Sequence, residues 1–309
     1  MKNSTFSYGL SGNLGDQIQS LACEQFLTKI DKRFDRDALK EVTEEEKYMT
    51  IMQGWFSHTP ERCFPPSASI VPVFYGFHIA NQNDNINHFL NPASVSYFKQ
   101  HQPIGCRDRK TMEMLINYGV DAFYSKCLTL TFPKREAEPQ NGKVYLVDVE
   151  NMKIPEAISK EAISVSHIVN PLWGEEIKYL MAKKLLNLYR DDARLVITKR
   201  LHCALPCIAM GIPVVFFGNP DDYRISIIKD LNIPINPIVL SKENMPNQQS
   251  IPPKFPFLNF LRKIETKTLE EDDTSKIDWN PTSILFEEEK KEIISNLNRL
   301  IRRTIERNS

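Results

Sequence analysis

The chain has 309 residues, with 39 lysines and arginines against 39 aspartates and glutamates and with 41% hydrophobic residues, enough for one large domain or two ordinary ones. Because the formal charges cancel and the apolar content is ordinary, the composition speaks against a nucleic-acid partner and excludes a disordered chain. The longest apolar runs, such as residues 212–217, have the length of a strand, so no membrane-spanning helix is predicted.

Short apolar runs alternate with amphipathic stretches along the chain, a pattern typical of βα units around a mostly parallel sheet. In chain order the sequence predicts strands at residues 5–10, 48–52, 70–77, 104–106, 123–124, 144–149, 163–169, 194–197 and 213–217. It predicts helices at residues 16–30, 94–99, 109–118, 175–190, 201–210 and 286–307. We therefore expect an α/β fold.

A polar break divides this pattern in two. Residues 133–142, PKREAEPQNG, hold two prolines and end in an Asn-Gly turn, as linkers do. The sequence thus predicts a first Rossmann-like domain over residues 1–135 and a second over residues 140–282. Within the second, residues 241–282 are rich in proline and charge and are expected to be irregular. An amphipathic helix is predicted within residues 283–309.

The first predicted strand runs into a glycine-rich turn, GLSGNLGD, at residues 9–16. Gly12 and Gly15 permit another group to approach the backbone closely, and the Asp16 side chain is expected to cap the following helix. Exposed N–H groups in such a turn suit an anion or a sugar hydroxyl. The turn lacks the spacing of a dinucleotide or P-loop fingerprint, so a purely structural turn is an equal alternative.

Arg107 follows the short strand 104–106 in the segment PIGCRDRKT. Ligands of open parallel sheets bind beyond the carboxyl ends of the strands, so this side chain is expected to point into a crevice. Its guanidinium group can hold a carboxylate or phosphate through two parallel hydrogen bonds. The alternative is a salt bridge to a nearby carboxylate. Asp108 is a candidate cap for the next helix.

Arg200 and His202 lie at the start of a helix in TKRLHCALPCIAMGIPVV, residues 198–215. The positive end of that helix would keep His202 neutral and available as a base. Pro206 has no N–H to donate to the His202 carbonyl, so either the helix begins later or a kink belongs to the site. The alternative is a structural role for His202, since single histidines are often structural. The neighbouring Arg200 favours a functional role.

Taken together, the sequence resembles the polysaccharide pyruvyl transferase family over nearly its whole length. The matching motifs are GNLGDQIQSLA at 12–22, GWF at 54–56, IGCRDRKT at 104–111, SKCLTLTF at 125–132, the segment 198–215 and IDWNP at 277–281. The most specific element is Arg-Leu-His followed by a small-residue helix and Gly-x-Pro-Val. The resemblance implies two Rossmann-like domains with mostly parallel sheets that face a central cleft, as in the GT-B-like glycosyltransferases.

The resemblance also implies an activity, the transfer of pyruvate from phosphoenolpyruvate to a sugar as a cyclic ketal. The family's catalytic Arg-x-His carries over to Arg200 and His202, with Leu201 between them as a further donor contact. Its donor-binding arginine carries over to Arg107 in the first domain, and His202 would act as general acid and base. Where a glycine is expected in the CLTLT segment of this subgroup, this chain has Lys126.

The acceptor implied by the resemblance is a sugar of a polysaccharide or of a lipid-linked glycan precursor. Trp55 and His78, at the ends of two predicted strands, are candidate acceptor residues, although Trp55 fits a core or lid position equally well. Asn13, Gly15 and Asp16 of the glycine turn are further candidates, with Asp16 also a candidate second acid or base.

Two other functions stay open at this stage. A nucleotide-sugar-dependent glycosyltransferase could use the same scaffold, since fold does not fix function. The acids of PDDYR at residues 220–224 would suit a ribose, but no glycine-rich diphosphate loop accompanies them. A non-catalytic relative that binds an anion or a glycan is the third hypothesis, and the intact set of Arg107, Arg200 and His202 argues against it.

We expect no cofactor beyond the donor substrate and no bound metal, because the six histidines show no ligand spacing. Six cysteines without a CxxC pair, and first residues without the order of a signal peptide, predict a cytoplasmic protein with free thiols. Arg302, Arg303 and Arg307 complement the dipole of the last helix, and peripheral contact with the inner membrane face is the alternative. The oligomeric state is not predicted.

Overall fold

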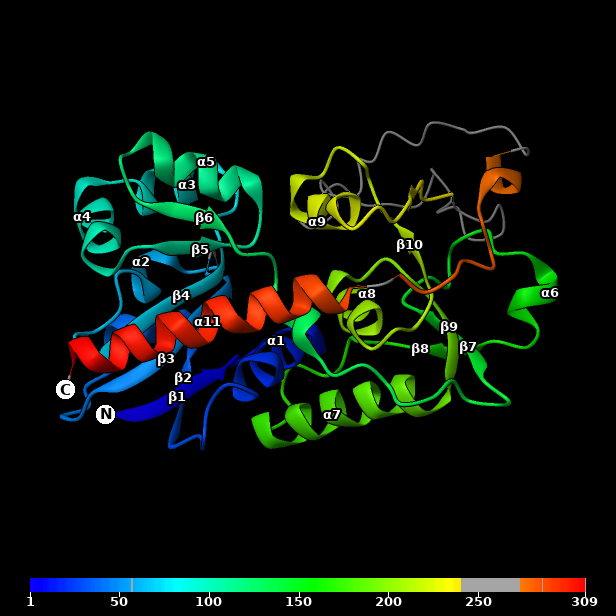
Figure 1. Ribbon diagram of the computed structural model, residues 1–309, viewed down its shortest axis with the longest axis horizontal. Coiled ribbons are helices and arrows are strands. Elements are labelled where there is room, and N and C mark those ends of the chain that lie inside the picture. The colour runs from blue at the N-terminus through cyan, green and yellow to red at the C-terminus, as the bar shows by residue number, and fades with distance from the viewer. Residues whose placement is uncertain (57, 240–272, 285, 309) are drawn as a thin grey trace, which may run out of the picture.

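The computed structural model describes residues 1–56, 58–239, 273–284 and 286–308, and it contains two β-sheets that stand side by side (Figure 1). Every strand pair in the described residues is parallel. The predicted α/β class with mostly parallel sheets is thus confirmed. The division into domains at 1–135, 140–282 and 283–309 stays a prediction, and the irregular segment lies outside the described residues up to position 272.

The first sheet has the strand order β2-β1-β3-β4-β5-β6. Its strands are β1 (Lys2–Ser7), β2 (Lys32–Asp35), β3 (Tyr48–Trp55), β4 (Ile70–His78), β5 (Ile104–Cys106) and β6 (Ala122–Tyr124). Its helical segments are α1 (Leu14–Glu24), η1 (Arg36–Glu41), α2 (Pro60–Cys63), α3 (Asn83–Phe89), α4 (Pro92–His101), α5 (Arg109–Asn117) and η2 (Leu128–Thr131). β4 is buried along its whole length, as expected of a parallel strand covered on both faces.

The second sheet has the strand order β11-β10-β9-β7-β8. Its strands are β7 (Lys143–Val147), β8 (Ile163–Val165), β9 (Ala193–Thr198), β10 (Val214–Phe217) and β11 (Ile235–Asn236). The helical segments that follow β7 in the chain are α6 (Glu156–Ser159), α7 (Glu175–Asp192), α8 (Leu201–Ala209), η3 (Tyr223–Ile225), α9 (Ser226–Asp230), η5 (Asp273–Lys276) and α11 (Glu287–Arg307).

Several predicted boundaries were wrong. The first strand ends at Ser7 rather than residue 10, the first helix ends at Glu24 rather than residue 30, and β8 ends at Val165 rather than residue 169. The strands β2 and β11 and the short helices η1, α2, α3, α6 and α9 were not predicted. Both missed strands lie at sheet edges. β2 carries three charges and β11 is only two residues long, so neither forms the apolar run that marks a buried strand.

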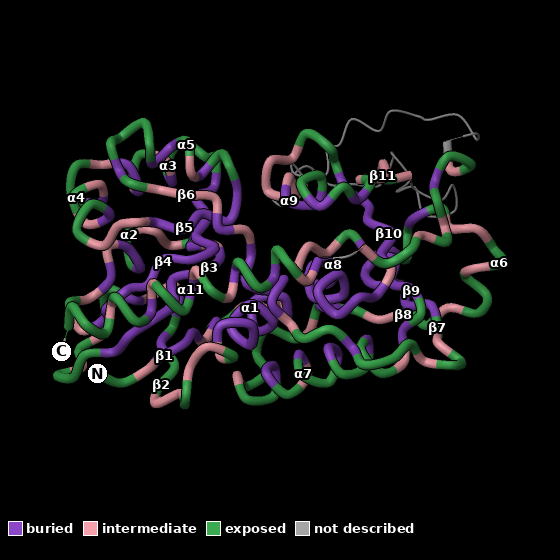
Figure 2. Tube along the Cα trace, viewed as in Figure 1, coloured by how far each residue is buried: buried purple, intermediate pink, exposed green. Residues whose placement is uncertain are grey.

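A continuous apolar core joins the two sheets, with α1 and α8 at its centre (Figure 2). The last helix, α11, returns from the second sheet across β4 of the first (Figure 1). Its predicted apolar face is confirmed, because Ile293, Leu297 and Ile301 are buried. The Lys290 ammonium donates to the Ala209 carbonyl oxygen over 2.7 Å, which holds the start of α11 on α8. No helix in the described residues is long and apolar enough to cross a bilayer.

Main-chain hydrogen bonds attach the glycine turn of the first half to the second half. The Leu14 N–H donates to the His167 carbonyl over 2.8 Å, and the Val169 N–H donates to the Gly12 carbonyl over 2.8 Å. A Cβ on Gly12 would lie 2.6 Å from the Val169 carbonyl oxygen, so only glycine fits this close approach. The turn thereby fixes the start of α1 against the second sheet, where the candidate site lies.

Candidate active site

The start of α1 and the start of α8 meet, and His202 packs on Gly15. A Cβ on Gly15 would lie 3.2 Å from the Cβ and 3.4 Å from the Nδ1 of His202. The expected close approach at Gly15 is therefore confirmed, and the approaching group is a candidate catalytic side chain from the other half of the chain.

Asn13, and not Asp16, caps α1, so the prediction that Asp16 caps this helix was wrong. The Asn13 Oδ1 accepts a hydrogen bond from the Gly15 N–H over 3.1 Å. The Asp16 carboxylate instead accepts the Ser11 hydroxyl over 2.6 Å and lies 3.5 Å from the buried Arg36 guanidinium. Asp16 is thus held in a structural ion pair, and its role toward an acceptor stays a prediction.

His202 occupies the first turn of α8, two residues after the N-cap residue Arg200. Its ψ of 17° is not helical, so the chain is kinked where Pro206 cannot donate to the His202 carbonyl, as the sequence suggested. Burial lowers the pKa of His202 well below its ordinary value, and the charge of Arg107 lowers it further. The ring is therefore neutral, as predicted, and the causes of its neutrality are burial and the charge of Arg107. Its Nε2 has no hydrogen-bond partner in the described residues.

Arg107 follows β5 and is 5% exposed, and its Nε has no partner in the described part of the chain. The alternative of a salt bridge to a protein carboxylate is not found there. The other buried basic side chains all contact protein oxygen atoms: Arg36 binds Asp37, Arg135 binds the Ala193 carbonyl, Lys178 binds the Gly9 carbonyl and Lys290 binds the Ala209 carbonyl. A buried charge is costly unless it is paired, so Arg107 is suited to an anionic ligand.

Arg200 is paired within the protein, with its Nε 2.7 Å from the Asp148 Oδ2. Burial alone would raise the pKa of Asp148, but the hydrogen bond from Ser166 and the Arg200 charge outweigh it and lower the pKa. Asp148 has a φ of 54°, a left-handed conformation that aspartate and asparagine adopt more readily than most residues. Asp148 was not predicted as a site residue, because no motif in the sequence marks this turn. Leu201 is half-buried and packs against the core.

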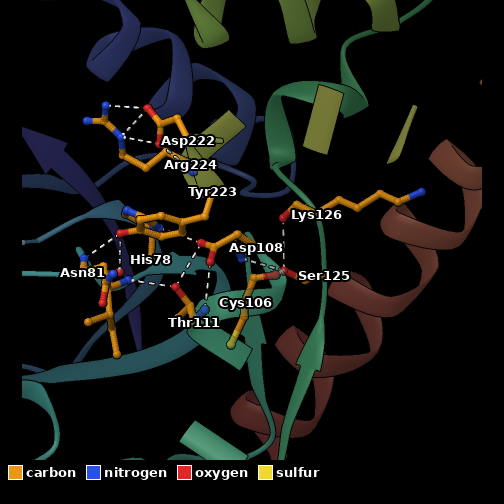
Figure 3. A network of polar contacts seen from close by, with 12 residues as sticks. His78, Asn81, Cys106, Asp108, Thr111, Ser125, Lys126, Asp222, Tyr223 and Arg224 are labelled. Carbon is orange, nitrogen blue, oxygen red and sulfur yellow. Dashed lines mark hydrogen bonds and ion pairs between the residues drawn. The ribbon is translucent and has the colours of Figure 1, made fainter. Parts of the chain in front are cut away.

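His78 ends β4 and is fully buried, with its Nδ1 2.6 Å from the Asp108 Oδ2 (Figure 3). The Asp108 Oδ1 accepts the Thr111 N–H over 2.8 Å and caps α5, which confirms the expected cap. Burial lowers the pKa of His78 to about 4, and the Arg107 charge contributes, against the opposing effect of Asp108. The charge of Arg107 lowers the pKa of both His78, from the first half, and His202, from the second.

Tyr223, from η3 of the second half, reaches the first half at His78 (Figure 3). The two rings are stacked with centroids 5.6 Å apart and an interplanar angle of 26°. The Tyr223 hydroxyl accepts the Asn81 N–H over 2.6 Å and donates to the Ile79 carbonyl over 3.2 Å. Tyr223 was not predicted as a site residue, because the acids of this segment were its only marked feature, and Asp222 pairs with Arg224 at 2.6 Å.

Trp55 and Lys126 take positions that the sequence left open. Trp55 is half-buried, meets His78 edge to face at 6.5 Å and stacks on His58 at 5.0 Å. Lys126 has a φ of 61° and its ammonium lies 5.4 Å from the centre of the Phe286 ring. Figure 3 shows this side chain running away from His78 and Asp108 toward α11. Lys126 thus does not join the other candidates.

A cavity of about 770 Å³ lies between residues 132–139 and α7, and it is lined by none of the candidate site residues. In the described residues no three His, Cys, Asp or Glu side chains come together as a metal site. All six cysteines are free and buried.

Comparisons with known proteins give one family. A family model described as polysaccharide pyruvyl transferase matches residues 13–222, from the N-cap of α1 to the residue before Tyr223. Among solved structures, the chain is similar to a functionally uncharacterized protein from Klebsiella pneumoniae, with 14% sequence identity and a TM-score of 0.44. That match covers 74% of this chain and 87% of the other. A comparison with curated proteins found no match.

Proposed function

The chain belongs to the polysaccharide pyruvyl transferase family, and on that premise we propose that it transfers pyruvate from phosphoenolpyruvate to two hydroxyl groups of one sugar as a cyclic ketal. The acceptor sugar belongs to a polysaccharide or to a lipid-linked glycan precursor. In this proposal the two sheets belong to two Rossmann-like domains that face a central cleft in the GT-B-like manner.

The buried Arg107 guanidinium, whose Nε has no hydrogen-bond partner in the described residues, is the observation that carries this proposal. Phosphoenolpyruvate presents a carboxylate and a phosphate on three carbons, and a guanidinium fork binds either group through two hydrogen bonds. Arg107 binds the donor from the first half. Arg200, oriented by Asp148, and the Leu201 N–H at the start of α8 bind it from the second half.

His202 is the acid–base residue of the proposed reaction. Protonation of the methylene carbon of the donor makes a methyl group and an oxocarbenium-like centre, to which the first sugar hydroxyl adds. Phosphate then leaves with the electron pair of its carbon–oxygen bond, and the second hydroxyl adds at the same carbon. Of the two hydroxyl protons released, one balances the methyl group and the other leaves with phosphate. Such proton transfer contributes typically ~10²–10⁴ in rate, and the reaction needs no further cofactor.

The acceptor side consists of Trp55, His78 and the glycine turn. Trp55 is half-buried, and Asn13, Gly15 and Asp16 lie at the start of α1, where Gly15 contacts His202. We place the enzyme in the cytoplasm, where lipid-linked precursors are reached at the inner membrane face. The exposed Arg302, Arg303 and Arg307 of α11 would supply peripheral contact there.

The proposal is tested by incubating the protein with phosphoenolpyruvate and a panel of galactosides, glucosides and N-acetylhexosamines. We expect phosphate release and an acid-labile product heavier than the sugar by one pyruvate less one water. Arg107→Ala and His202→Ala should each lower the rate by roughly 10²–10⁴, whereas Arg190→Ala, which removes an exposed ion pair with Asp191, should not. Thermal protection by nucleotide sugars and none by phosphoenolpyruvate would instead identify a glycosyltransferase.

A further inference from the structure

The pair of His78 and Asp108 is a second buried acid–base unit in the same site. Both side chains are shielded from solvent, at 0% and 1% exposure of the residues, and they are 2.6 Å apart. The Nε2 of His78 has no hydrogen-bond partner in the described residues. We propose that His78 is a second catalytic base, which takes the proton of one acceptor hydroxyl at Nε2, with Asp108 and Tyr223 as its positioning residues.

The hydrogen bonds of Asp108 determine which nitrogen of His78 is the base. The Asp108 Oδ2 accepts the Thr111 hydroxyl over 2.9 Å, and Oδ1 accepts the Thr111 N–H. Burial would raise the pKa of Asp108, but the bond from His78 and the charge of Arg107 lower it, so the group is a carboxylate. An ionised carboxylate only accepts hydrogen bonds, so Nδ1 of His78 donates to it. In a neutral ring Nε2 then carries the free electron pair.

Ketal formation requires the removal of two hydroxyl protons, so a second base has a role in the reaction. Two hydroxyl groups of one sugar add to the same carbon, and each must lose its proton. His202 comes from the second half and His78 from the first, and Arg107 affects the pKa of both. His78 takes the proton of one hydroxyl as that oxygen forms its bond to the pyruvyl carbon. The proton returns from Nε2 to the departing phosphate, which balances the step.

Tyr223 holds the imidazole of His78 in position. Its ring stacks on the imidazole, and its hydroxyl is bonded to the Asn81 N–H and the Ile79 carbonyl of the first half (Figure 3). His78 has no exposed surface, so an acceptor reaches Nε2 only after neighbouring side chains move. The two hydrogen bonds of Tyr223 keep its ring, and with it the imidazole face, in a fixed position.

This inference rests on the proposed function, so its first test does not depend on catalysis. Nitrogen-15 NMR of histidine-labelled protein reports which ring nitrogen carries the proton. We expect an unprotonated Nε2 for His78 in the wild type and a protonated Nε2 in Asp108→Asn. The asparagine side chain of that variant keeps the oxygen that caps α5, while its amide group donates to Nδ1. A protonated Nε2 in an active wild-type enzyme would overturn the role of His78 alone.

The second test is kinetic. In His78→Asn the new amide nitrogen can still donate to Asp108, so the fold is kept and only the base is lost. We expect kcat to fall by roughly 10²–10⁴ with the KM for phosphoenolpyruvate unchanged, and a comparable fall in Asp108→Asn. Tyr223→Phe, which keeps the stacked ring, should recover most of the activity that Tyr223→Ala loses.

The matched control is His88→Asn, since the His88 Nε2 lies 2.7 Å from the Phe64 carbonyl oxygen and the residue, in α3, belongs to no part of the site. It should keep the wild-type kcat. A His78→Asn variant that keeps its kcat and shows only a higher KM for the sugar would make His78 a binding residue and refute the proposal. A wild type that releases no phosphate from phosphoenolpyruvate with any sugar would refute the proposed function itself.

Discussion

Replacing Gly15 by alanine tests whether His202 must sit where α1 begins. Gly15 is the second residue of α1 and has no left-handed φ, so alanine is compatible with its backbone. The added Cβ would lie 3.2 Å from the His202 Cβ and 3.1 Å from the Asn13 Oδ1. Carbon atoms in contact prefer about 3.5–4.0 Å, so the imidazole has to move by roughly 0.3–0.8 Å.

The expected effects on stability and activity are very different in size. Alanine is more favourable than glycine in a helix by roughly 0.5–1 kcal/mol, and the tight contact costs roughly 1–3 kcal/mol, so the free energy of unfolding falls by at most about 2.5 kcal/mol. A misplacement of about 1 Å in a catalytic group costs roughly 10²-fold in rate. We therefore expect Gly15→Ala to lower kcat by roughly 10–100-fold while the protein stays folded.

The assay is phosphate release from phosphoenolpyruvate with an accepted sugar, combined with thermal unfolding of the same samples. Gly174→Ala is the matched control, because a Cβ at Gly174 meets nothing within 4 Å. That variant should keep its kcat even if α7 loses some stability at its N-cap. If Gly15→Ala folds and keeps the kcat of the wild type, the contact with His202 has no catalytic meaning and our account of the glycine turn is wrong.

Three further predictions concern the hydrogen bonds and charges around the site. Asn13→Ala removes the cap of α1 and should lower the free energy of unfolding by about 1 kcal/mol in urea titrations. Asp148→Asn tolerates the left-handed backbone but removes the charge that holds the partly exposed Arg200; we expect ~1–2 kcal/mol less stability and a higher KM for phosphoenolpyruvate. The pKa of His78 is about 4 against an ordinary 6.5, so between these pH values the unfolded chain binds a proton that the folded chain does not. The free energy of unfolding should therefore fall by up to roughly 3 kcal/mol as the pH drops from 6.5 to 4, and by less in His78→Asn, as measured by denaturation at each pH.

The fold class followed from the sequence because the central strands are buried on both faces and form clear apolar runs. The predicted strand 104–106 coincides with β5, and the strand predicted at 70–77 differs from β4 by one residue. The edge strand β2 reads KRFD, which carries three charges in four residues and one buried side chain. β2 pairs with β1 through main-chain hydrogen bonds, and the pattern of hydrophobic side chains along the sequence does not reveal such pairing.

The candidate site was predictable as far as it depends on strand ends. Arg107 and Arg200 each follow a strand of a parallel sheet, which placed them at the edges where ligands bind. The hydrogen-bond partner of each guanidinium comes from a turn that is distant in the sequence, so it could not be predicted. A salt bridge was considered for Arg107, but it is Arg200 that forms one, with Asp148. Tyr223 was not predicted for the same reason, since its hydrogen-bond partners at Ile79 and Asn81 belong to the other half of the chain.

The two halves are joined more firmly on one side of the site than on the other. Beside the glycine turn, main-chain hydrogen bonds link Leu14 to His167 and Gly12 to Val169. Leu14 and His167 are buried, so breaking their bond leaves unpaired groups that cost roughly 1–3 kcal/mol. On the other side, the contacts in the described residues include those of Tyr223 and the ion pair of Arg109 with Asp230, a half-exposed pair that water can replace at little cost. We therefore expect the two halves to separate more readily at Tyr223 than at the glycine turn.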